Sequence, residues 1–175
     1  MSSTTTYQVR HATLRDAKAI AELHNLTMME SFKGIVAPED MPVVSQEKRQ
    51  AYWREAIEYS EPHVQVAMDG EKIVGFVGYD RSRDKGTPNT MGEVWAIFAA
   101  PAYWGQGVGL ALWDAAREGL IEEGCTRVSL WAPLANERVM RFHDLAGFKR
   151  ELPTAKTVPF GKVKIEEIRL KRELN

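Results

Sequence analysis

Four stretches of the chain place apolar residues three and four positions apart, the spacing that gathers them on one side of a helix. The first stretch follows Thr13–Asp16, a polar segment close to a capping box. Ser45 and Asn136 are residue types that cap helix N-termini, and they precede the second and fourth stretches. The predicted helices cover residues 14–29, the stretch after Ser45 that Pro62 ends, a stretch that holds Val108 to Gly119, and Asn136 to Ala146.

Seven shorter stretches have the alternation, or the β-branched and aromatic content, of strands. Val64 to Met68 alternates, and the Asp69-Gly70 pair that follows it is a hairpin turn signal. Gly92 to Ala100 is almost wholly apolar, which indicates a strand buried on both faces. The predicted strands cover residues 7–11, 64–68, 72–80, 92–100, 127–131, 148–151 and 163–171.

The predicted elements follow one another in the order β-α-α-β-β-β-α-β-α-β-β. This order favours an α/β fold (α+β with a mixed sheet) with helices on both sides, rather than a regular βαβ repeat. The chain has 175 residues, the length of one ordinary domain. We therefore expect a single domain over residues 7–175, preceded by a flexible N-terminal tail over the polar residues 1–6.

The charge balance and the cysteine count reduce the classes of partner and site that the chain can have. The 23 Lys and Arg nearly cancel the 24 Asp and Glu, so the chain lacks the basic footprint of nucleic-acid binding and is not expected at an anionic membrane. Its one cysteine, Cys125, excludes an intrachain disulfide and a cysteine-rich metal site, and we interpret it as a small buried hydrophobe. No signal peptide and no apolar run near the ~20 residues of a membrane span are present, which favours the cytoplasm. The sequence leaves the oligomeric state open, a homodimer included.

A glycine-rich loop, Gly105-Gln106-Gly107-Val108-Gly109, stands between the apolar strand and the third predicted helix. A nucleotide P-loop needs Lys and then Ser or Thr after its last glycine, whereas Leu110 and Ala111 follow here. A dinucleotide fingerprint needs a third glycine, and Leu110 or Leu112 stands at that position. The remaining feature is a set of open backbone N–H groups at a helix N-terminus, which suits a pyrophosphate. A tight turn that only permits close packing explains the glycines equally well.

The residues around this loop resemble the acetyl-CoA-binding motif of the GNAT superfamily of N-acetyltransferases. That motif consists of an apolar strand, a proline soon after it, an aromatic residue and then Gln/Arg-x-x-Gly-x-Gly/Ala. Here the strand runs into Pro101, Tyr103 supplies the aromatic residue, and the last glycines are Gly107 and Gly109. The Gln/Arg position holds Trp104, which departs from the family pattern.

A second stretch, Asn136 through Phe148, is similar to a later motif of the same family. That motif has an Asn and then an aromatic residue, usually Tyr, four residues before Gly-Phe. Asn136, Gly147 and Phe148 match it, whereas the Tyr position holds His143. The two motifs, the opening Arg-His-Ala-Thr-Leu-Arg-Asp-Ala segment and the element order extend the resemblance over nearly the whole chain.

The resemblance implies a GNAT-like fold whose central sheet is splayed after the fourth strand, and acetyl-CoA as the cofactor. The splayed strand would leave backbone N–H groups near Ala99 and Ala100 free for the thioester and for the oxyanion that forms from it, and one such donor is worth roughly 3 kcal/mol in a transition state. The residues that we expect to hold acetyl-CoA are Phe98, Ala99, Ala100, Trp104, Gly105, Gln106, Gly107, Val108, Gly109, Leu110 and Asn136.

Glu93 is the leading candidate to take the proton that a primary amine carries near neutral pH. It begins the apolar strand, on the side that we expect Trp95, Ile97 and Ala99 to share. A carboxylate in a buried strand is costly unless it is paired or stands at a wet site. Many members of the family that the chain resembles carry an acid at this position. A strand-end Glu in a salt bridge is the alternative interpretation.

His143 falls on the inward side of its predicted helix. The resemblance implies a role for it, because the matching Tyr of the family can protonate the departing thiolate. A neutral imidazole could supply that proton or hydrogen-bond the sulfur. A histidine that only packs at a helix end is the alternative.

The remaining candidates carry less information. His11, His24 and His63 share no metal-ligand spacing, so we interpret them as structural and expect no metal site. Glu30, Phe32, Asp40 and Trp53 fall where the acceptor loops of the family usually lie, and Glu30, Phe32 and Trp53 are the substrate-site candidates. Ordinary helix packing explains them equally well.

Taken with the resemblance, these features predict an acetyl-CoA-dependent N-acetyltransferase that acts on a primary amine by direct attack of the amine on the thioester. The near-neutral charge favours a small-molecule acceptor over a basic protein tail. Two alternatives stay open. One is a non-catalytic acyl-CoA-binding module, which the departures at Trp104 and His143 support, and the other is a nucleotide-binding domain, which the missing Lys and third glycine disfavour.

Overall fold

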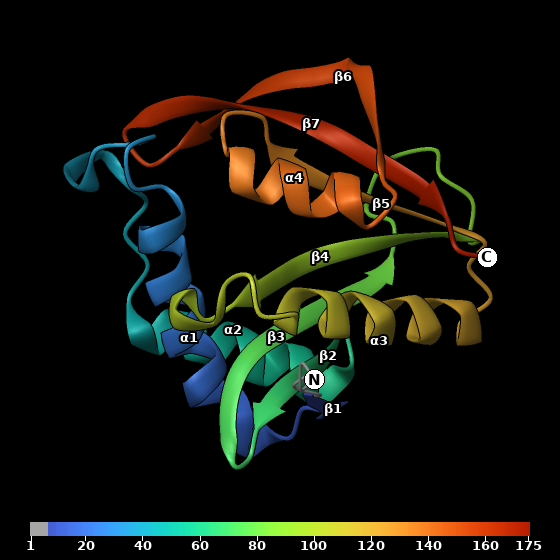
Figure 1. Cartoon of the computed structure of the whole chain (residues 1–175), viewed down its shortest axis with the longest axis horizontal. Coiled ribbons are helices and arrows are strands. Elements are labelled where there is room, and N and C mark those ends of the chain that lie inside the picture. The colour runs from blue at the N-terminus through green and yellow to red at the C-terminus, as the bar shows by residue number, and fades with distance from the viewer. Residues whose placement is uncertain (1–6) are drawn as a thin grey trace, which may run out of the picture.

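Within residues 7–175, which the computed structural model describes, seven strands pair into one mixed sheet in the order β1-β2-β3-β4-β5-β7-β6 (Figure 1). The expected tail at residues 1–6 lies outside the described residues. Neighbouring strands run antiparallel except β4 and β5, which are parallel. The strands are β1 (Gln8–His11), β2 (His63–Asp69), β3 (Lys72–Arg81), β4 (Met91–Ala99), β5 (Arg127–Pro133), β6 (Lys149–Phe160) and β7 (Val163–Glu173).

The helices are α1 (Ala17–Ser31), α2 (Gln46–Tyr59), α3 (Val108–Glu122) and α4 (Glu137–Leu145), with 3₁₀ turns at Leu14–Asp16, Pro38–Asp40 and Pro101–Tyr103. α2 and α4 begin directly after their predicted caps, whereas α1 begins at Ala17, after a 3₁₀ turn, instead of at residue 14. The Ser45 hydroxyl accepts a hydrogen bond from the Lys48 N–H at 3.2 Å, and the Asn136 side-chain oxygen accepts one from the Val139 N–H at 3.2 Å. The predicted element order and fold class are confirmed.

The last two strands are longer than predicted, most of all β6, which extends to Phe160 instead of ending near Glu151. Pro153 and Pro159 conceal this strand in the sequence, since proline interrupts a sheet ladder. β6 is the last strand in the sheet order, and its pairing with β7 shifts register between Glu151 and Lys156. An edge strand with an irregular register tolerates proline, which a central strand does not.

The helices cover the sheet from both sides and enclose two apolar cores (Figure 1). In the larger core, Leu112 and Leu120 of α3 and Met140 of α4 pack against the strands. In the smaller core, Ile20 of α1 and Trp53 of α2 pack against the opposite face. The helical spacing of the apolar residues is therefore explained by burial against a sheet on each side.

A third apolar cluster joins the end of α1 to the β6–β7 hairpin. Phe32 and Met41 pack with Phe160 in this cluster. The tip of the hairpin is also hydrogen-bonded to the segment after α1, because the Lys162 N–H donates to the Asp40 carbonyl at 2.9 Å. A Cβ on Gly161 would collide with that carbonyl, so the contact requires glycine. The two segments together form an arch over the end of the sheet.

The sheet is splayed between β4 and β5, as predicted. Their parallel ladder holds only three pairs, from Met91↔Arg127 to Glu93↔Ser129. β4 then continues to Ala99 and β5 to Pro133 without pairing to each other, while β5 pairs along its whole length with β7. Figure 1 shows the two strands separating from right to left, with α4 beside the widening gap.

A β-bulge in β4 overturns one expectation about Glu93. The register between β3 and β4 shifts by one residue, which leaves Trp95 as the extra residue of the bulge. Val94, Ile97 and Ala99 all belong to the α3–α4 core or pack against it. Glu93, which adjoins Val94 in the alternating part of the strand, therefore lies on the opposite face. The prediction that Glu93 shares a side with Ile97 and Ala99 is wrong, because the bulge reverses the alternation between them.

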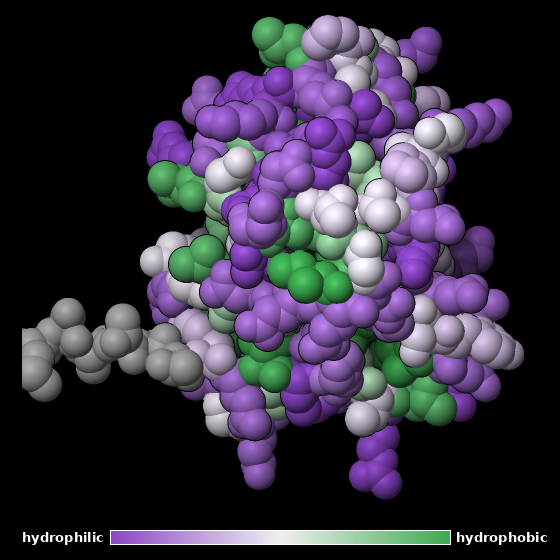
Figure 2. All heavy atoms as spheres, turned by 90° about the vertical axis from the view of Figure 1, so that its right-hand side faces the viewer, coloured by the Kyte–Doolittle hydropathy of each residue, from purple (hydrophilic) through white to green (hydrophobic). Residues whose placement is uncertain are grey.

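Most large apolar side chains lie in the cores between the layers. The face on the right-hand side of Figure 1 is accordingly mostly hydrophilic, and its apolar side chains form small separate groups (Figure 2). In the part of the chain that the structure describes, no helix is both long enough and apolar enough to cross a membrane.

Candidate active site

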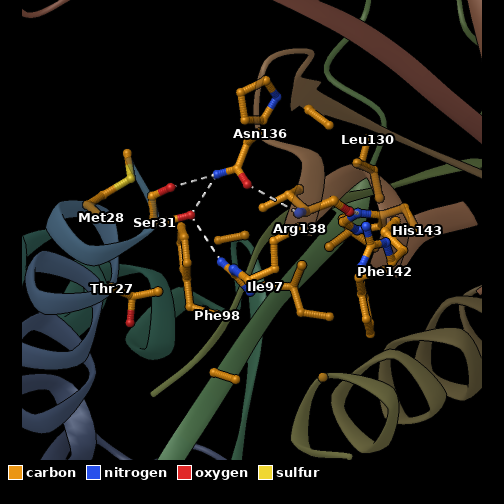
Figure 3. Close-up of a pocket in the computed structure, with 18 of the residues that line it drawn as sticks. Thr27, Met28, Ser31, Ile97, Phe98, Leu130, Asn136, Arg138, Phe142 and His143 are labelled. Carbon is orange, nitrogen blue, oxygen red and sulfur yellow. Dashed lines mark hydrogen bonds between the residues drawn. The ribbon is translucent and has the colours of Figure 1, made fainter. Parts of the chain in front are cut away.

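A cavity of about 1110 Å³ occupies the gap between β4 and β5. Figure 3 shows its walls: Thr27, Met28 and Ser31 come from α1 on one side, Phe142 and His143 come from α4 on the other, and Ile97 and Phe98 of β4 lie between them. The lining continues onto α3, β5 and the β6–β7 hairpin. The cavity therefore connects the α3–α4 face of the sheet with the α1 face through the gap.

Most residues predicted to hold the cofactor line this cavity, but two do not. The lining set is Phe98, Ala99, Trp104, Gly105, Gly107, Val108, Gly109, Leu110 and Asn136. The Ala100 N–H, expected to be free, donates to the Val74 carbonyl of β3 at 2.8 Å. The Gln106 side chain hydrogen-bonds the Ala102 carbonyl at 3.0 Å. Ala100 is thus engaged in the sheet and Gln106 in its own turn.

The free edge of β4 offers Ala99 rather than Ala100. Successive N–H groups of a strand point to opposite edges. Because the Ala100 N–H is directed at β3, the Ala99 N–H is directed at the gap that β5 has left. The expectation of free N–H groups near Ala99 and Ala100 therefore fails for Ala100, and the geometry leaves Ala99 as the donor at the gap.

The glycines of the loop have two different physical roles. Gly105 and Gly107 have φ values of +77° and +91°, and nothing lies within 4 Å of a Cβ built on either. They form an open turn at the N-terminus of α3, where helix N–H groups and the helix dipole favour an anion. Gly109 instead allows α3 to approach α4, since its Cβ would lie 2.9 Å from the Phe142 ring. The close-packing interpretation therefore applies to Gly109, whereas Gly105 and Gly107 have the open geometry that an anion site requires.

Trp104, the departure from the family motif, closes part of the free edge of β4. Its indole N–H donates to the Ala99 carbonyl at 2.9 Å. The Arg138 guanidinium lies 3.6 Å from the centre of the Trp104 ring, a cation–π contact that joins the loop to α4. The Trp104 side chain therefore makes its contacts within the protein, to β4 and to α4.

Asn136 is fully engaged inside the protein. Besides capping α4, its side-chain amide donates to the Ser31 carbonyl at 3.0 Å and to the Ser31 hydroxyl at 2.8 Å (Figure 3). Arg138 donates to the same hydroxyl at 3.0 Å. These bonds join α4 to the end of α1 across the cavity. Asn136 holds the two walls in position, and its side-chain groups are not free for a ligand.

His143 lines the cavity and has a buried ring nitrogen without a hydrogen-bond partner among the described residues. The side chain is only 4% exposed, and its Nδ1 lies 2.9 Å from the Val139 carbonyl. A carbonyl only accepts, so Nδ1 carries the hydrogen and Nε2 carries a lone pair. Among the described residues Nε2 has no hydrogen-bond partner. Burial lowers the pKa of His143 to about 4, so the imidazole is neutral near pH 7. In this state His143 accepts a hydrogen bond or a proton and has none to give at Nε2.

Glu93 has surroundings unlike those of a free base. It is 2% exposed and does not line the cavity. The Arg83 guanidinium donates to its two oxygens at 2.6 and 3.3 Å, and the Arg83 backbone N–H adds a bond at 2.9 Å. The same guanidinium lies 4.1 Å from the centre of the Trp95 ring, which does line the cavity. Glu93 therefore reaches the cavity only through Arg83 and Trp95.

The acceptor-site candidates separate in the structure. Phe32 lines the cavity. Glu30 does not, and it pairs with Lys33 at 3.0 Å. Trp53 is buried in the smaller core, where its indole N–H donates to His24 Nδ1 at 3.0 Å. A Trp in that position stabilises the α1–α2 layer and does not reach a ligand in the cavity.

The sequence does not predict many of the residues that line the cavity, among them Thr27, Trp131 and Glu167. Thr27 stands in the first predicted helix, and the other two stand in predicted strands without a motif. They reach one cavity because the β5–β7 pairing and the arch bring distant segments together. No local pattern carries that information.

We predict acid-sensitive stability from the buried histidines. Burial lowers the pKa of His24 to about 3 and of His143 to about 4, below the ordinary value near 6.5. The unfolded chain therefore binds more protons than the folded one below pH 6.5, and the free energy of unfolding falls as the pH falls. For His143 alone, the loss between pH 7 and pH 5 is about 2 kcal/mol.

Urea unfolding at both pH values measures this loss. A His143→Asn variant, whose amide can still donate to the Val139 carbonyl, should lose about 2 kcal/mol less than the parent between pH 7 and pH 5. Equal losses in parent and variant would contradict the assignment of a neutral buried imidazole.

Comparison with known proteins agrees with this geometry. The model of the acetyltransferase (GNAT) family matches residues 20–148. An uncharacterized N-acetyltransferase of Archaeoglobus fulgidus is 29% identical over 129 residues, which cover 70% of this chain and 82% of the relative. A mycothiol acetyltransferase of Propionibacterium freudenreichii is 37% identical over 76 residues, 43% of this chain. This chain spans only 24% of the length of that relative.

Solved structures share the fold over nearly the full chain. The structure of yncA from Salmonella typhimurium with acetyl-CoA has a TM-score of 0.75 at 20% identity, over 98% of this chain and 95% of that one. An N-acetyltransferase from Staphylococcus aureus has a TM-score of 0.76 at 14% identity, over 98% and 100%. The paiA N-acetyltransferase from Thermoplasma acidophilum with coenzyme A has a TM-score of 0.69 at 14% identity, over 97% and 99%.

The sheet is splayed between β4 and β5, and the glycine turn stands at the start of α3, as the two sequence motifs predict. The family model covers well over half of the residues, including both motifs. On this evidence the chain belongs to the acetyltransferase (GNAT) family.

Proposed function

We propose that this protein transfers an acetyl group from acetyl-CoA to a primary amine, and that the acceptor is a small molecule rather than a protein. One observation carries the proposal: a single cavity passes through the β4–β5 gap, lined by the glycine turn at one end and by α1 and the β6–β7 hairpin at the other end, the chamber. A transferase needs two such approaches to one reacting centre. The net charge of −1 favours a small acceptor over a basic protein tail.

The residues at the glycine-turn end of the cavity fit acetyl-CoA. Gly105 and Gly107 leave open space at a helix N-terminus, which suits the pyrophosphate. Arg138 and Arg141 line the same cavity and supply positive charge. The cofactor complexes of yncA and paiA support the same choice.

Acetyl-CoA, when bound, supplies the activated carbonyl carbon that the amine attacks. The Ala99 N–H, directed into the gap, is the donor that we assign to the carbonyl oxygen, where one donor contributes roughly 3 kcal/mol. The amine attacks as the neutral base, after its ammonium proton has left to solvent, and His143 Nε2 would accept the second proton, which the nitrogen loses once it has attacked. With a pKa of about 4 the imidazolium holds this proton weakly, so it passes it to the departing thiolate. The proton thus moves from nitrogen to sulfur through one side chain.

Calorimetry and an assay of thiol release test the proposal. We expect acetyl-CoA and CoA to bind, ATP not to bind, and free thiol to form only when a primary amine is added. Cofactor binding without thiol release from any amine would indicate a non-catalytic acyl-CoA-binding module. Tight ATP binding without a response to acetyl-CoA would indicate a nucleotide-binding domain.

We propose that Glu93 is a positioning residue that holds Arg83 and, through it, Trp95. Glu93→Gln should lower kcat less than about tenfold and leave the pH profile of kcat unchanged, since Arg83 already occupies both carboxylate oxygens. Steady-state kinetics from pH 6 to pH 9 measure both quantities. A fall in kcat of about a hundredfold, relieved at high pH and with acetyl-CoA affinity intact, would make Glu93 the base that the sequence predicts.

We also propose the cytoplasm as the location. Cys125 is buried and forms no disulfide, which suits a reducing compartment. Cell fractionation tests the location, and light scattering after size-exclusion chromatography separates a monomer from the homodimer that the sequence leaves open.

A further inference from the structure

The chamber, the end of the cavity beside α1 and the β6–β7 hairpin, is lined by residues from the face of the sheet opposite α3 and α4. Leu130, Ala132 and Ile168 belong to the α3–α4 core. Alternation along β5 and β7 therefore directs Trp131 and Glu167 to the other face, where both line the cavity. This end of the cavity is distinct from the glycine turn and lies on the side from which an acceptor would approach.

The walls of this chamber are mainly apolar and are held in place. Phe32 and Phe160 contact each other with ring centres 4.6 Å apart, and both line the cavity. Trp95 and Trp131 line it from β4 and β5. The arch, fixed by the bond from Lys162 to Asp40, keeps the hairpin wall over the chamber. A ligand here would bury an apolar body against aromatic rings.

The indole faces at this end already attract cations. The Lys156 ammonium lies 3.9 Å from the centre of the Trp131 ring, and the Arg83 guanidinium lies 4.1 Å from that of Trp95. Two cation–π contacts, one on Trp131 and one on Trp95, therefore lie beside the chamber. The arginines themselves are neutralised: Arg83 by Glu93, and Arg169 by Glu151 and Asp84.

Glu167 is a charged residue of the chamber that forms no ion pair among the described residues. Burial raises its pKa, an effect that its cross-strand neighbour Lys156 partly opposes. Lys156 itself lies over the Trp131 ring, so it compensates the half-buried carboxylate only in part, and a bound ammonium would stabilise it further.

We propose that Glu167 attracts the ammonium form of the acceptor into the cavity, before the amine loses its proton and attacks, and that the acceptor is a cationic amine with an apolar body that packs against Trp95 and Trp131. This inference rests on the proposed acetyl transfer and adds the residue and the substrate class. An amine with a carboxylate beside its amino group is disfavoured, because that carboxylate would approach Glu167.

The test compares Glu167→Gln with Glu166→Gln. Glu166 is the preceding residue of β7 and is exposed. The control therefore removes the same negative charge, one residue away, from the surface instead of from the cavity. We expect Glu167→Gln to raise the KM for 2-phenylethylamine about 10- to 100-fold. The Kd of the same amine, titrated by calorimetry into protein saturated with CoA, should rise equally. The Kd for acetyl-CoA should not change in either variant, and Glu166→Gln should behave as the parent.

A matched pair of probes tests the substrate class. Phenylalanine has the ring and amino group of 2-phenylethylamine plus a carboxylate. The parent should bind it at least about tenfold more weakly, and Glu167→Gln should narrow that difference, because the repulsion between carboxylates is lost. Preference of the parent for phenylalanine, or its failure to bind 2-phenylethylamine, would overturn the inference.

The inference and the proposed function fail in different ways. If no amine releases thiol from acetyl-CoA with the parent, the proposed acetyl transfer fails and the inference falls with it. If amines release thiol but KM and Kd are the same for the parent and Glu167→Gln, only the role of Glu167 is overturned. Loss of acetyl-CoA binding in Glu167→Gln would also overturn that role, because the residue would then act on the cofactor end.

Discussion

Gly107→Val is expected to weaken acetyl-CoA binding on the order of a hundredfold or more. The Cβ of residue 107 would enter the open space beside the N-terminus of α3, where we assign the pyrophosphate. The branched side chain would also resist the φ of +91°, so the turn would move away from the conformation that directs its N–H groups at the ligand. Calorimetric titration with acetyl-CoA and with CoA measures the loss.

Gly86→Val is the matched control. Gly86 has a φ of +78°, and a Cβ built on it meets nothing within 4 Å, but it lies in the loop between β3 and β4 and does not line the cavity. The control therefore carries a similar backbone strain without the proposed contact. Equal affinities for acetyl-CoA in a folded Gly107→Val protein and in the parent would remove the cofactor assignment from this turn.

The sequence predicts the elements that depend on local interactions. Ser45 and Asn136 cap their helices because a short polar side chain satisfies an N–H group two or three residues ahead. The glycine turn was found because glycine is the residue that adopts a positive φ without strain. The GNAT-like fold and the splay followed from two motifs that match family patterns at the level of single residues.

Long-range contacts explain what the sequence does not predict. The bulge at Trp95 reverses the face of Glu93, and no residue near it signals the register shift. Ala100 and Ala99 look equivalent in the sequence, yet pairing with Val74 takes the N–H of one and leaves the other at the gap. Glu167 becomes a site candidate only because β7 pairs with β5 beside the diverging β4. Each of these depends on which strand lies next to which.

His143 variants are expected to produce the second large effect. If Nε2 accepts the proton of the amine, His143→Phe should lower kcat about a hundredfold or more, because the ring remains but the acceptor is lost. The KM for acetyl-CoA should change little. Stopped-flow thiol release with saturating acetyl-CoA and amine measures the effect. A His143→Phe enzyme with normal kcat would reduce the histidine to a packing residue.

His143→Tyr decides in which direction the proton moves at this position. A phenol is a donor with a pKa near 10, whereas the resting imidazole offers a lone pair at Nε2, because the Val139 carbonyl holds the hydrogen at Nδ1. If proton acceptance limits the rate, the tyrosine variant should be nearly as slow as His143→Phe near neutral pH. It should recover relative to His143→Phe as the pH rises, because the phenol then ionises to a phenolate, which can accept the proton. A tyrosine variant at least as fast as the parent at pH 7 would show instead that donation to the departing sulfur matters. His143 would then receive its proton by another route before the sulfur leaves.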